Sequence, residues 1–231
     1  MSLMDKISNQ AAYTQVRMNI TGTDGIGKST FGAGAPKPIF ICAEDGLRFI
    51  DIPHFPVCET YNDIMEQVKE SHNIKTIEAL GYGKGFTESY ELFARILRNL
   101  EALSVAKKMN IILLSHVQIR TFSDPEHEPY DRYELNTHKK ISSLIRSWVD
   151  FNFFANHLFT TIKSGQGFNE KARGKTFSDK RYLFTKRTAA FDAKSRLQLP
   201  ERIDFNWPAF TDACKATVIP NETINKGGQN V

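Results

Sequence analysis

The stretch GTDGIGKST, residues 22–30, decides the fold of this chain. It fits the spacing G-x-x-x-x-G-K-[ST] at every fixed position. Glycines let the backbone curl so that successive N–H groups face a phosphate, and a helix that begins at Lys28 adds its positive end. The residues predicted to bind a nucleoside triphosphate are Gly22, Thr23, Asp24, Gly25, Ile26, Gly27, Lys28, Ser29 and Thr30.

Two side chains of this loop have predictable roles. Lys28 reaches the β- and γ-phosphates, and the Ser29 hydroxyl is a ligand for Mg²⁺. The context agrees, because residues 16–21 predict a strand before the loop and residues 28–33 predict a helix after it. The sequence therefore predicts ATP and Mg²⁺ as ligands.

Composition narrows the class of protein. The chain has 231 residues, of which 41% are hydrophobic and 24% charged, the balance of an ordinary globular domain. No apolar run approaches the roughly 20 residues of a membrane helix, and the first residues lack the apolar core of a signal peptide. Its three cysteines, Cys42, Cys58 and Cys214, have no paired spacing and predict reduced thiols. We expect a cytoplasmic protein without a membrane partner.

Apolar periodicity predicts alternating strands and helices along the chain. Beyond the loop, strands are predicted at 38–43, 110–116, 149–155, 159–162 and 182–186, and helices at 61–71, 87–108 and 138–148. Such alternation predicts an α/β fold with a mostly parallel central sheet flanked by helices. We expect residues 1–212 to form one nucleotide-binding domain and residues 213–231 to form a polar tail.

One resemblance concerns the loop alone. "TGTDGIGKST" is similar to the loop of thymidylate kinases, and Asp131-Arg132-Tyr133 matches their aspartate-arginine-aromatic signature. In those kinases the signature ends an apolar strand, whereas here it follows the polar stretch DPEHEP at 124–129. A nucleotide kinase therefore stays as an alternative.

A longer resemblance covers most of the chain. Five blocks occur in order: "GKSTFGAGAPKPIFICAEDGL", "GYGKGF", "MNIILLSHVQIR", "YDRYELNTHKK" with "WVDFNFFAN", and "TKRTAAFDAKSR" before "LP". They resemble the phage-encoded RecA-like ATP-binding proteins, the branch that includes single-strand-annealing recombinases. The resemblance implies a RecA-like P-loop NTPase core and a DNA-dependent ATPase in phage recombination or repair. It also implies single-stranded DNA, further copies of the chain and a phage single-strand-binding protein as partners.

The resemblance also implies catalytic residues. In RecA-like proteins a glutamate at the end of the strand after the loop helix activates the attacking water, and Glu44 takes that position, with Asp45 beside it. A carboxylate at the carboxyl end of a parallel strand suits general-base work. A polar sensor of the γ-phosphate follows a later strand, and His116 or Gln118 fills that role by resemblance.

One expected carboxylate has no counterpart in the sequence. RecA-like ATPases carry a second apolar strand ending in an aspartate that holds Mg²⁺ through water. The corresponding segment reads ESHNIKTIEALGYGKGF, and Asp150 lies in the wrong order. Three alternatives stay open: Glu44 or Asp45 substitutes, hydrolysis is weak or lost and the chain is a nucleotide-binding module, or the chain lacks a segment that its relatives carry.

Two segments bear on DNA. Residues 120–140 mix both signs of charge and predict a loop that orders on binding. Residues 163–187 carry a net charge of +6 with interleaved aromatic residues, which is typical of single-stranded DNA contacts, although a solvated charged hairpin has the same pattern. The predicted DNA-binding residues are Lys171, Arg173, Lys175, Phe177, Lys180 and Arg181. Lys186 and Arg187 are candidates to reach a neighbouring subunit's nucleotide.

Overall fold

The computed structural model describes residues 15–60, 62–64, 66, 85–126, 128–164 and 171–217. The strands are β1 (Arg17–Gly22), β2 (Ile111–Phe122), β3 (Tyr130–Leu135), β4 (Phe151–Ser164), β5 (Lys171–Phe184), β6 (Lys194–Ser195) and β7 (Arg202–Asp204). The helices are α1 (Lys28–Ala33), α3 (Gly85–Lys107), α4 (Lys139–Trp148) and α5 (Trp207–Thr217). In this part of the chain no helix is long and apolar enough to cross a membrane.

The strands form one mixed sheet in the order β3-β2-β1-β4-β5-β7, with β6 also paired to β4. The strand β1 runs parallel to both β2 and β4, but the other ladders between the described strands are antiparallel. The prediction of a mostly parallel sheet is therefore wrong. The cause is that β2–β3 and β4–β5 are consecutive strands joined by short connections, which impose antiparallel pairing.

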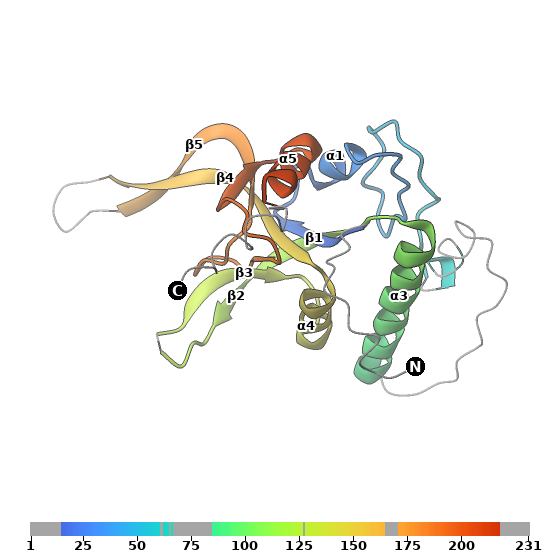
Figure 1. Cartoon of the computed structure of the whole chain (residues 1–231). Helices are drawn as coiled ribbons and strands as arrows, with labels where there is room; N and C mark the ends of the chain where they lie inside the picture. Colours follow the sequence, from blue (N-terminus) through green and yellow to red (C-terminus); the bar gives the residue numbers. More distant parts are fainter. Residues whose placement is uncertain are drawn as a thin grey trace, which may run out of the picture.

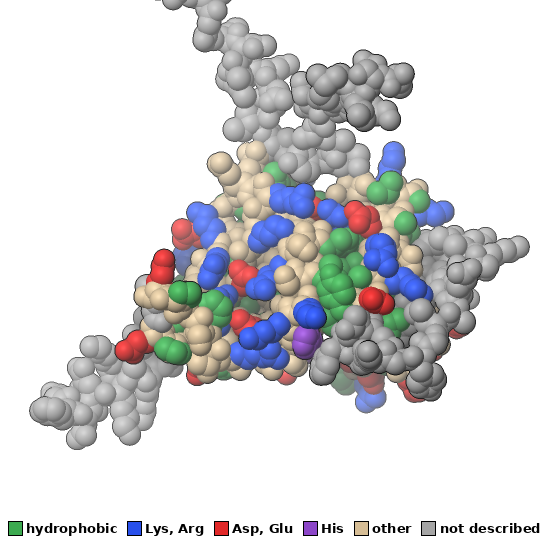
Figure 2. Space-filling view, turned by 90° about the horizontal axis from the view of Figure 1, so that it is seen from below, with side chains coloured by type: hydrophobic (Ala, Val, Ile, Leu, Met, Phe, Trp, Pro, Cys, Tyr) green, Lys and Arg blue, Asp and Glu red, His purple; other side chains and the backbone are tan. Residues whose placement is uncertain are grey.

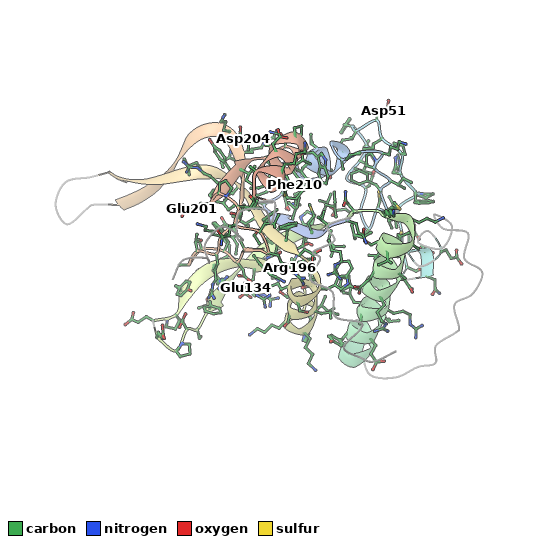
Figure 3. The ribbon with its side chains drawn as sticks, viewed as in Figure 1. Asp51, Glu134, Arg196, Glu201, Asp204 and Phe210 are labelled. Carbon is green, nitrogen blue, oxygen red and sulfur yellow. The ribbon has the colours of Figure 1, made fainter. Side chains whose placement is uncertain are left out.

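Helices cover both faces of the sheet, as predicted (Figure 1). On one face, α1 and α5 pack Phe31 and Phe210 against a core that includes Met18, Ile20 and Phe153 (Figure 3). On the other face, α3 and α4 cover the sheet. The buried residues there are Leu97, Leu100 and Leu103 of α3, Ile145 of α4, and Ile111, Leu135 and Val149. The result is an α/β domain whose central strands are enclosed.

A long two-stranded ribbon replaces the predicted basic loop. The strand β4 continues through the predicted gap at 156–158, and its pairing with β5 extends to Ser164 opposite Lys171. The register shifts between His157 and Phe159, and the ribbon then projects beyond the rest of the sheet (Figure 1). Because the two strands satisfy each other's backbone groups, most of residues 163–187 is strand rather than loop.

Other predictions also need correction. Residues 120–140, predicted as a loop, form the β2–β3 hairpin and the start of α4, with Thr121 opposite Asp131. The predicted strand at 38–43 contributes one isolated bridge, from Phe40 to His54, and no ladder. Pro38 lacks the N–H group that a ladder needs. The helix α5 crosses the predicted domain boundary at 212 and places Phe210 in the core. The segments 67–84 and 218–231 lie outside the described residues.

Candidate nucleotide site

The loop between β1 and α1 depends on glycine at three positions. Gly25 and Gly27 have φ angles of 73° and 100°, in the left-handed region that other residues rarely adopt. Gly22 lies opposite His116 of β2 and Ala155 of β4, and a Cβ atom there would lie 2.7 Å from the Ala155 carbonyl oxygen. The loop thus leaves the carboxyl end of the central parallel strand, as the sequence predicted.

The Lys28 side chain is directed into this loop. Its Nζ atom donates to the carbonyl oxygens of Gly22, at 2.9 Å, and Thr23, at 3.1 Å. Burial lowers the pKa of Lys28, while the carboxylates of Asp24 and Glu44 act in the opposite direction. Phosphate oxygens are stronger acceptors than carbonyls, so a triphosphate would compete for this ammonium.

His116 joins the loop to Glu44. Its Nδ1 atom lies 2.5 Å from Oδ1 of Asp24, and its Nε2 atom lies 2.8 Å from Oε1 of Glu44. The hydrogen bonds to Glu44 and Asp24 raise the pKa of His116. The pairing of His116 with Gly22 explains the contact with the loop. The sequence indicated His116 and Glu44 separately but gave no signal that Asp24 completes the chain.

Glu44 reaches His116 from an irregular segment rather than from the end of a sheet strand. Its neighbour Asp45 turns to Arg48 instead, with 2.7 Å between Oδ2 and Nη2. A cavity of about 590 Å³ opens beside both carboxylates and is also lined by Asp51, labelled in Figure 3, and by His54. Of the two adjacent carboxylates, Glu44 is therefore the one in contact with the site.

Gln118, the other candidate sensor, lies farther along β2. It pairs with Glu134 of β3, and its side-chain amide lies beside Arg120 and Asn136. The hydrogen bonds of the described residues join His116, and not Gln118, to Glu44. The structure thus brings His116 to the loop and leaves Gln118 in the hairpin.

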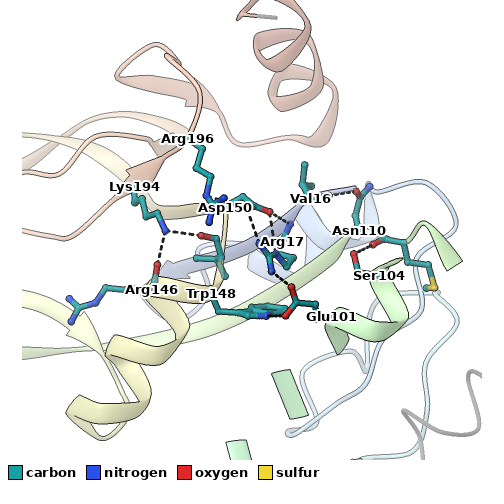
Figure 4. A network of polar contacts seen from close by, with 12 residues as sticks. Val16, Arg17, Glu101, Ser104, Asn110, Arg146, Trp148, Asp150, Lys194 and Arg196 are labelled. Carbon is teal, nitrogen blue, oxygen red and sulfur yellow. Dashed lines mark hydrogen bonds and ion pairs between the residues drawn. The ribbon is translucent and has the colours of Figure 1, made fainter. Parts of the chain in front are cut away.

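Asp150 lies at the other end of the parallel strands (Figure 4). Its Oδ2 atom accepts from the backbone N–H of Arg17 at 3.0 Å, and its Oδ1 atom lies 3.2 Å from Nη2 of the same residue. Arg196 is a further partner at 3.3 Å. Burial acts to raise the pKa of Asp150, but the hydrogen bonds and charge of Arg17 bring it below its usual value. Asp150 therefore holds the beginning of β1 next to the beginning of β4 and is not part of the nucleotide site.

The residues of the loop fit a bound Mg²⁺–nucleotide. Ser29 follows Lys28 in the first turn of α1 and is half-buried. Among the residues that the structure describes, no group of three or more His, Cys, Asp or Glu side chains is arranged to hold a metal ion. Magnesium bound through phosphate oxygens, waters and one or two protein ligands needs no such cage, so Ser29 remains the candidate metal ligand.

The predicted DNA-binding residues divide into two groups. Lys171, Arg173 and Lys175 occupy alternate positions of β5, opposite Ser164, Ile162 and Thr160 of the ribbon, and Phe177 also lies in β5. Lys180 is exposed and lies 3.4 Å from Oδ2 of Asp204. Arg181 is different, because its Nη1 atom donates to the Ile26 carbonyl oxygen of the loop at 3.0 Å. No pattern in the sequence predicts this contact.

Lys186 and Arg187 lie on another part of the surface. Together with Lys194 and Gln198 they line a second cavity of about 880 Å³. The Nζ atom of Lys186 lies 3.6 Å from Oε1 of Glu201. Within the described residues, no hydrogen bond or ion pair joins Lys186 or Arg187 to the loop of their own chain.

A buried polar chain across the central strands was also missed. The Nδ2 atom of Asn19 donates to Oδ1 of Asn152 at 2.8 Å, and the Ser115 hydroxyl donates to Oδ1 of Asn19 at 2.7 Å. These bonds tie β1 to β4 and β2 below the loop. Asn19 within the apolar run MNI was the available signal in the sequence.

Comparisons with known proteins identify the family of the chain. The model of the family described as AAA domain matches residues 14–75 and 57–197, which together include the loop, Glu44, His116 and Arg181. A search of curated proteins finds no match. The family match covers more than half of the chain, and its first part begins just before β1. The chain therefore belongs to the AAA domain family of ATP-binding P-loop proteins.

Proposed function

We propose that the protein hydrolyses ATP at the loop 22–30 and that single-stranded DNA on the β4–β5 ribbon stimulates this reaction. The observation that carries the hydrolysis is the chain Asp24–His116–Glu44, which ends on a carboxylate next to the loop. A binding module without turnover has no need of a carboxylate held in this way. The proposed substrate is ATP and the proposed metal is Mg²⁺.

The roles follow from the contacts. Lys28 binds the phosphates, because its ammonium already points into the loop. Glu44 takes the proton of the attacking water, and His116 orients Glu44 through the 2.8 Å hydrogen bond. Mg²⁺, when bound at Ser29, would neutralise charge that develops on the phosphates. Glu44, with Asp45 next to it, is also the candidate for holding the metal through water.

Two features support the DNA part of the proposal. Lys171, Arg173 and Lys175 alternate along a ribbon that projects from the sheet (Figure 1), an arrangement that suits a sugar–phosphate backbone. Figure 2 shows Lys and Arg side chains spread over the face that carries α4 and the β2–β3 hairpin. A positive surface raises the local concentration of a polyanion. We place the activity in phage recombination or repair, in an oligomer whose Lys186 and Arg187 reach the neighbouring nucleotide.

Release of inorganic phosphate, measured with Mg²⁺ and ATP in the presence and absence of an oligothymidine, tests the proposal. We expect turnover that the oligothymidine accelerates. ATP binding without any release would show a nucleotide-binding module and refute hydrolysis. Phosphorylation of dTMP in the same assay would instead identify a nucleotide kinase. Turnover that no single-stranded DNA changes would remove the DNA part alone.

A further inference from the structure

Arg181 of β5 contacts the phosphate-binding loop. In the sheet, β5 and the β2 strand that carries His116 lie on opposite sides of β1. The Nη1 atom of Arg181 donates to the Ile26 carbonyl oxygen at 3.0 Å. A Cβ atom built on Gly27 would lie 2.3 Å from this Nη1 atom. The glycine therefore has a second purpose besides its φ of 100°, because the bare Cα lets a guanidinium lie against the loop.

Arg181 carries a charge that no described carboxylate neutralises. Within the described residues, no carboxylate pairs with Arg181, whereas the adjacent Lys180 lies 3.4 Å from Asp204. A guanidinium has five N–H donors, and the bond to Ile26 uses one of them. An exposed cation with free donors, placed on a phosphate-binding loop, is a ready partner for an oxyanion.

The backbone around Arg181 is held firmly. Its carbonyl oxygen accepts from the Phe205 N–H at 3.0 Å, and the Phe205 ring stacks on Phe31 of α1 with centroids 5.1 Å apart. Across the ribbon Arg181 pairs with His157, where the register shift begins. The residue thus sits at the root of the ribbon and beside the helix that follows the loop.

We propose that Arg181 is a second cationic ligand of the nucleotide's phosphates, supplied by the same chain from the root of the β4–β5 ribbon. The inference rests on the proposed nucleotide site and deepens it. The N–H of Gly27 belongs to the backbone that cradles the phosphates, so a guanidinium against Gly27 lies within reach of the same oxyanion. Both Lys28 and Arg181 donate to loop carbonyls, and both would exchange these acceptors for phosphate oxygens.

Substitutions at position 181 separate this role from a structural one. Arg181→Gln keeps an N–H donor for Ile26 but removes the charge, Arg181→Lys keeps the charge but not the planar fork, and Arg181→Ala removes both. Lys215→Gln is the matched control, since it deletes an exposed charge of α5 that pairs with Asp212. Displacement of a fluorescent ATP analogue by ATP and by inorganic tripolyphosphate gives each affinity, and tripolyphosphate reports on the phosphate contacts without the base.

We expect Arg181→Gln and Arg181→Ala to weaken the binding of ATP and of tripolyphosphate about tenfold or more. Arg181→Lys should lose less affinity, and Lys215→Gln should match the parent. Thermal unfolding of Arg181→Gln should match the parent as well. Parental affinity in Arg181→Gln, with Arg181→Ala weakened, would show that Arg181 only holds the loop and would overturn the inference. If the parent binds ATP and Lys28→Ala does not, the proposed function stands even when the inference about Arg181 is overturned. A parent that binds no nucleotide refutes both proposals.

Discussion

The Nε2 atom of His116 lies 2.8 Å from the Oε1 atom of Glu44. One residue comes from the middle of β2 and the other from an irregular segment after α1. The imidazole of His116 links Glu44 to the loop, because its other nitrogen contacts Asp24. A base for hydrolysis needs a fixed direction as well as a suitable pKa, and in the proposed mechanism His116 supplies the direction.

His116→Gln should slow ATP turnover by about 10²-fold while ATP affinity changes little. The amide keeps one hydrogen bond but cannot contact both carboxylates at once in the same geometry. Gln118→Ala is the matched control, because Gln118 lies on the same strand but pairs with Glu134 of the β2–β3 hairpin. Steady-state phosphate release gives both rates. Slower turnover in Gln118→Ala than in His116→Gln would transfer the sensor role to Gln118.

Protonation of His116 should stabilise the fold. Its pKa in the folded protein is raised above the ordinary value of 6.5 by hydrogen bonds to Glu44 and Asp24. The stabilisation is therefore fully present below about pH 6.5 and is lost as the pH rises through the raised pKa. Urea unfolding should be measured from about pH 5.5 to 8.5, the range in which histidine titrates. The free energy of unfolding should fall with rising pH in the parent through this titration, and His116→Gln should lack this component. Identical pH profiles for the two proteins would contradict the geometry.

Asp150→Ala should lower the free energy of unfolding by about 2 kcal/mol, since Arg17 loses a charged hydrogen-bond partner. Because the pKa of Asp150 is lowered in the folded protein, its contribution is present above the ordinary value of 3.8 and is lost as the pH falls through the lowered pKa. ATP affinity should not change. Asp192→Ala, which removes a more exposed ion pair with Arg146, should cost less than 1 kcal/mol. Urea unfolding measures both, and lost ATP affinity in a stable Asp150→Ala would place Asp150 at the nucleotide.

The ribbon should give DNA binding a distinct salt dependence. Replacing Lys171, Arg173 and Lys175 by Ala should flatten the slope of log K against log salt by up to about two units, if each touches a phosphate with a slope of about 0.7. Phe177→Ala should instead weaken binding by roughly 1–3 kcal/mol without changing the slope. Fluorescence anisotropy with an oligothymidine measures both effects. Lys215→Ala on α5, a lysine paired with Asp212, is the control and should keep the parental slope. A parental slope in the triple variant would refute the ribbon contact.

The sequence was sufficient to predict elements that depend on interactions between residues close in the chain. The spacing of residues 22–29 predicted the loop and α1, and apolar periodicity predicted α3 and α4 within about two residues. It failed for the sheet. The predicted strand at 38–43 has no ladder, and the ribbon extends through polar residues that no apolar alternation marks. Pairing between β4 and β5 depends on a partner strand, which a single segment does not reveal.

The site was predicted in the same uneven way. Lys28 and Ser29 follow from spacing, and Glu44 and His116 followed from resemblance. The contact of Asp24 with His116 and that of Arg181 with Ile26 join residues separated by 92 and 155 positions. Such pairs are set by strand order and register, which place β2 and β5 near the loop only in the folded chain. The charge of residues 163–187 predicted DNA contact for Arg181 and its basic neighbours, but the structure brings Arg181 to the loop instead.

The rate of phosphate release by Glu44→Gln, compared with that of the parent under saturating ATP and Mg²⁺, tests the central claim most directly. The amide preserves the shape of the side chain and accepts a hydrogen bond, but it cannot take a proton from water. We predict unchanged ATP affinity and a fall in turnover of at least about 10²-fold, while Asp45→Asn, which affects a carboxylate paired with Arg48, retains most of its activity. Undiminished turnover in Glu44→Gln would contradict the account, because the base that activates water would then lie elsewhere.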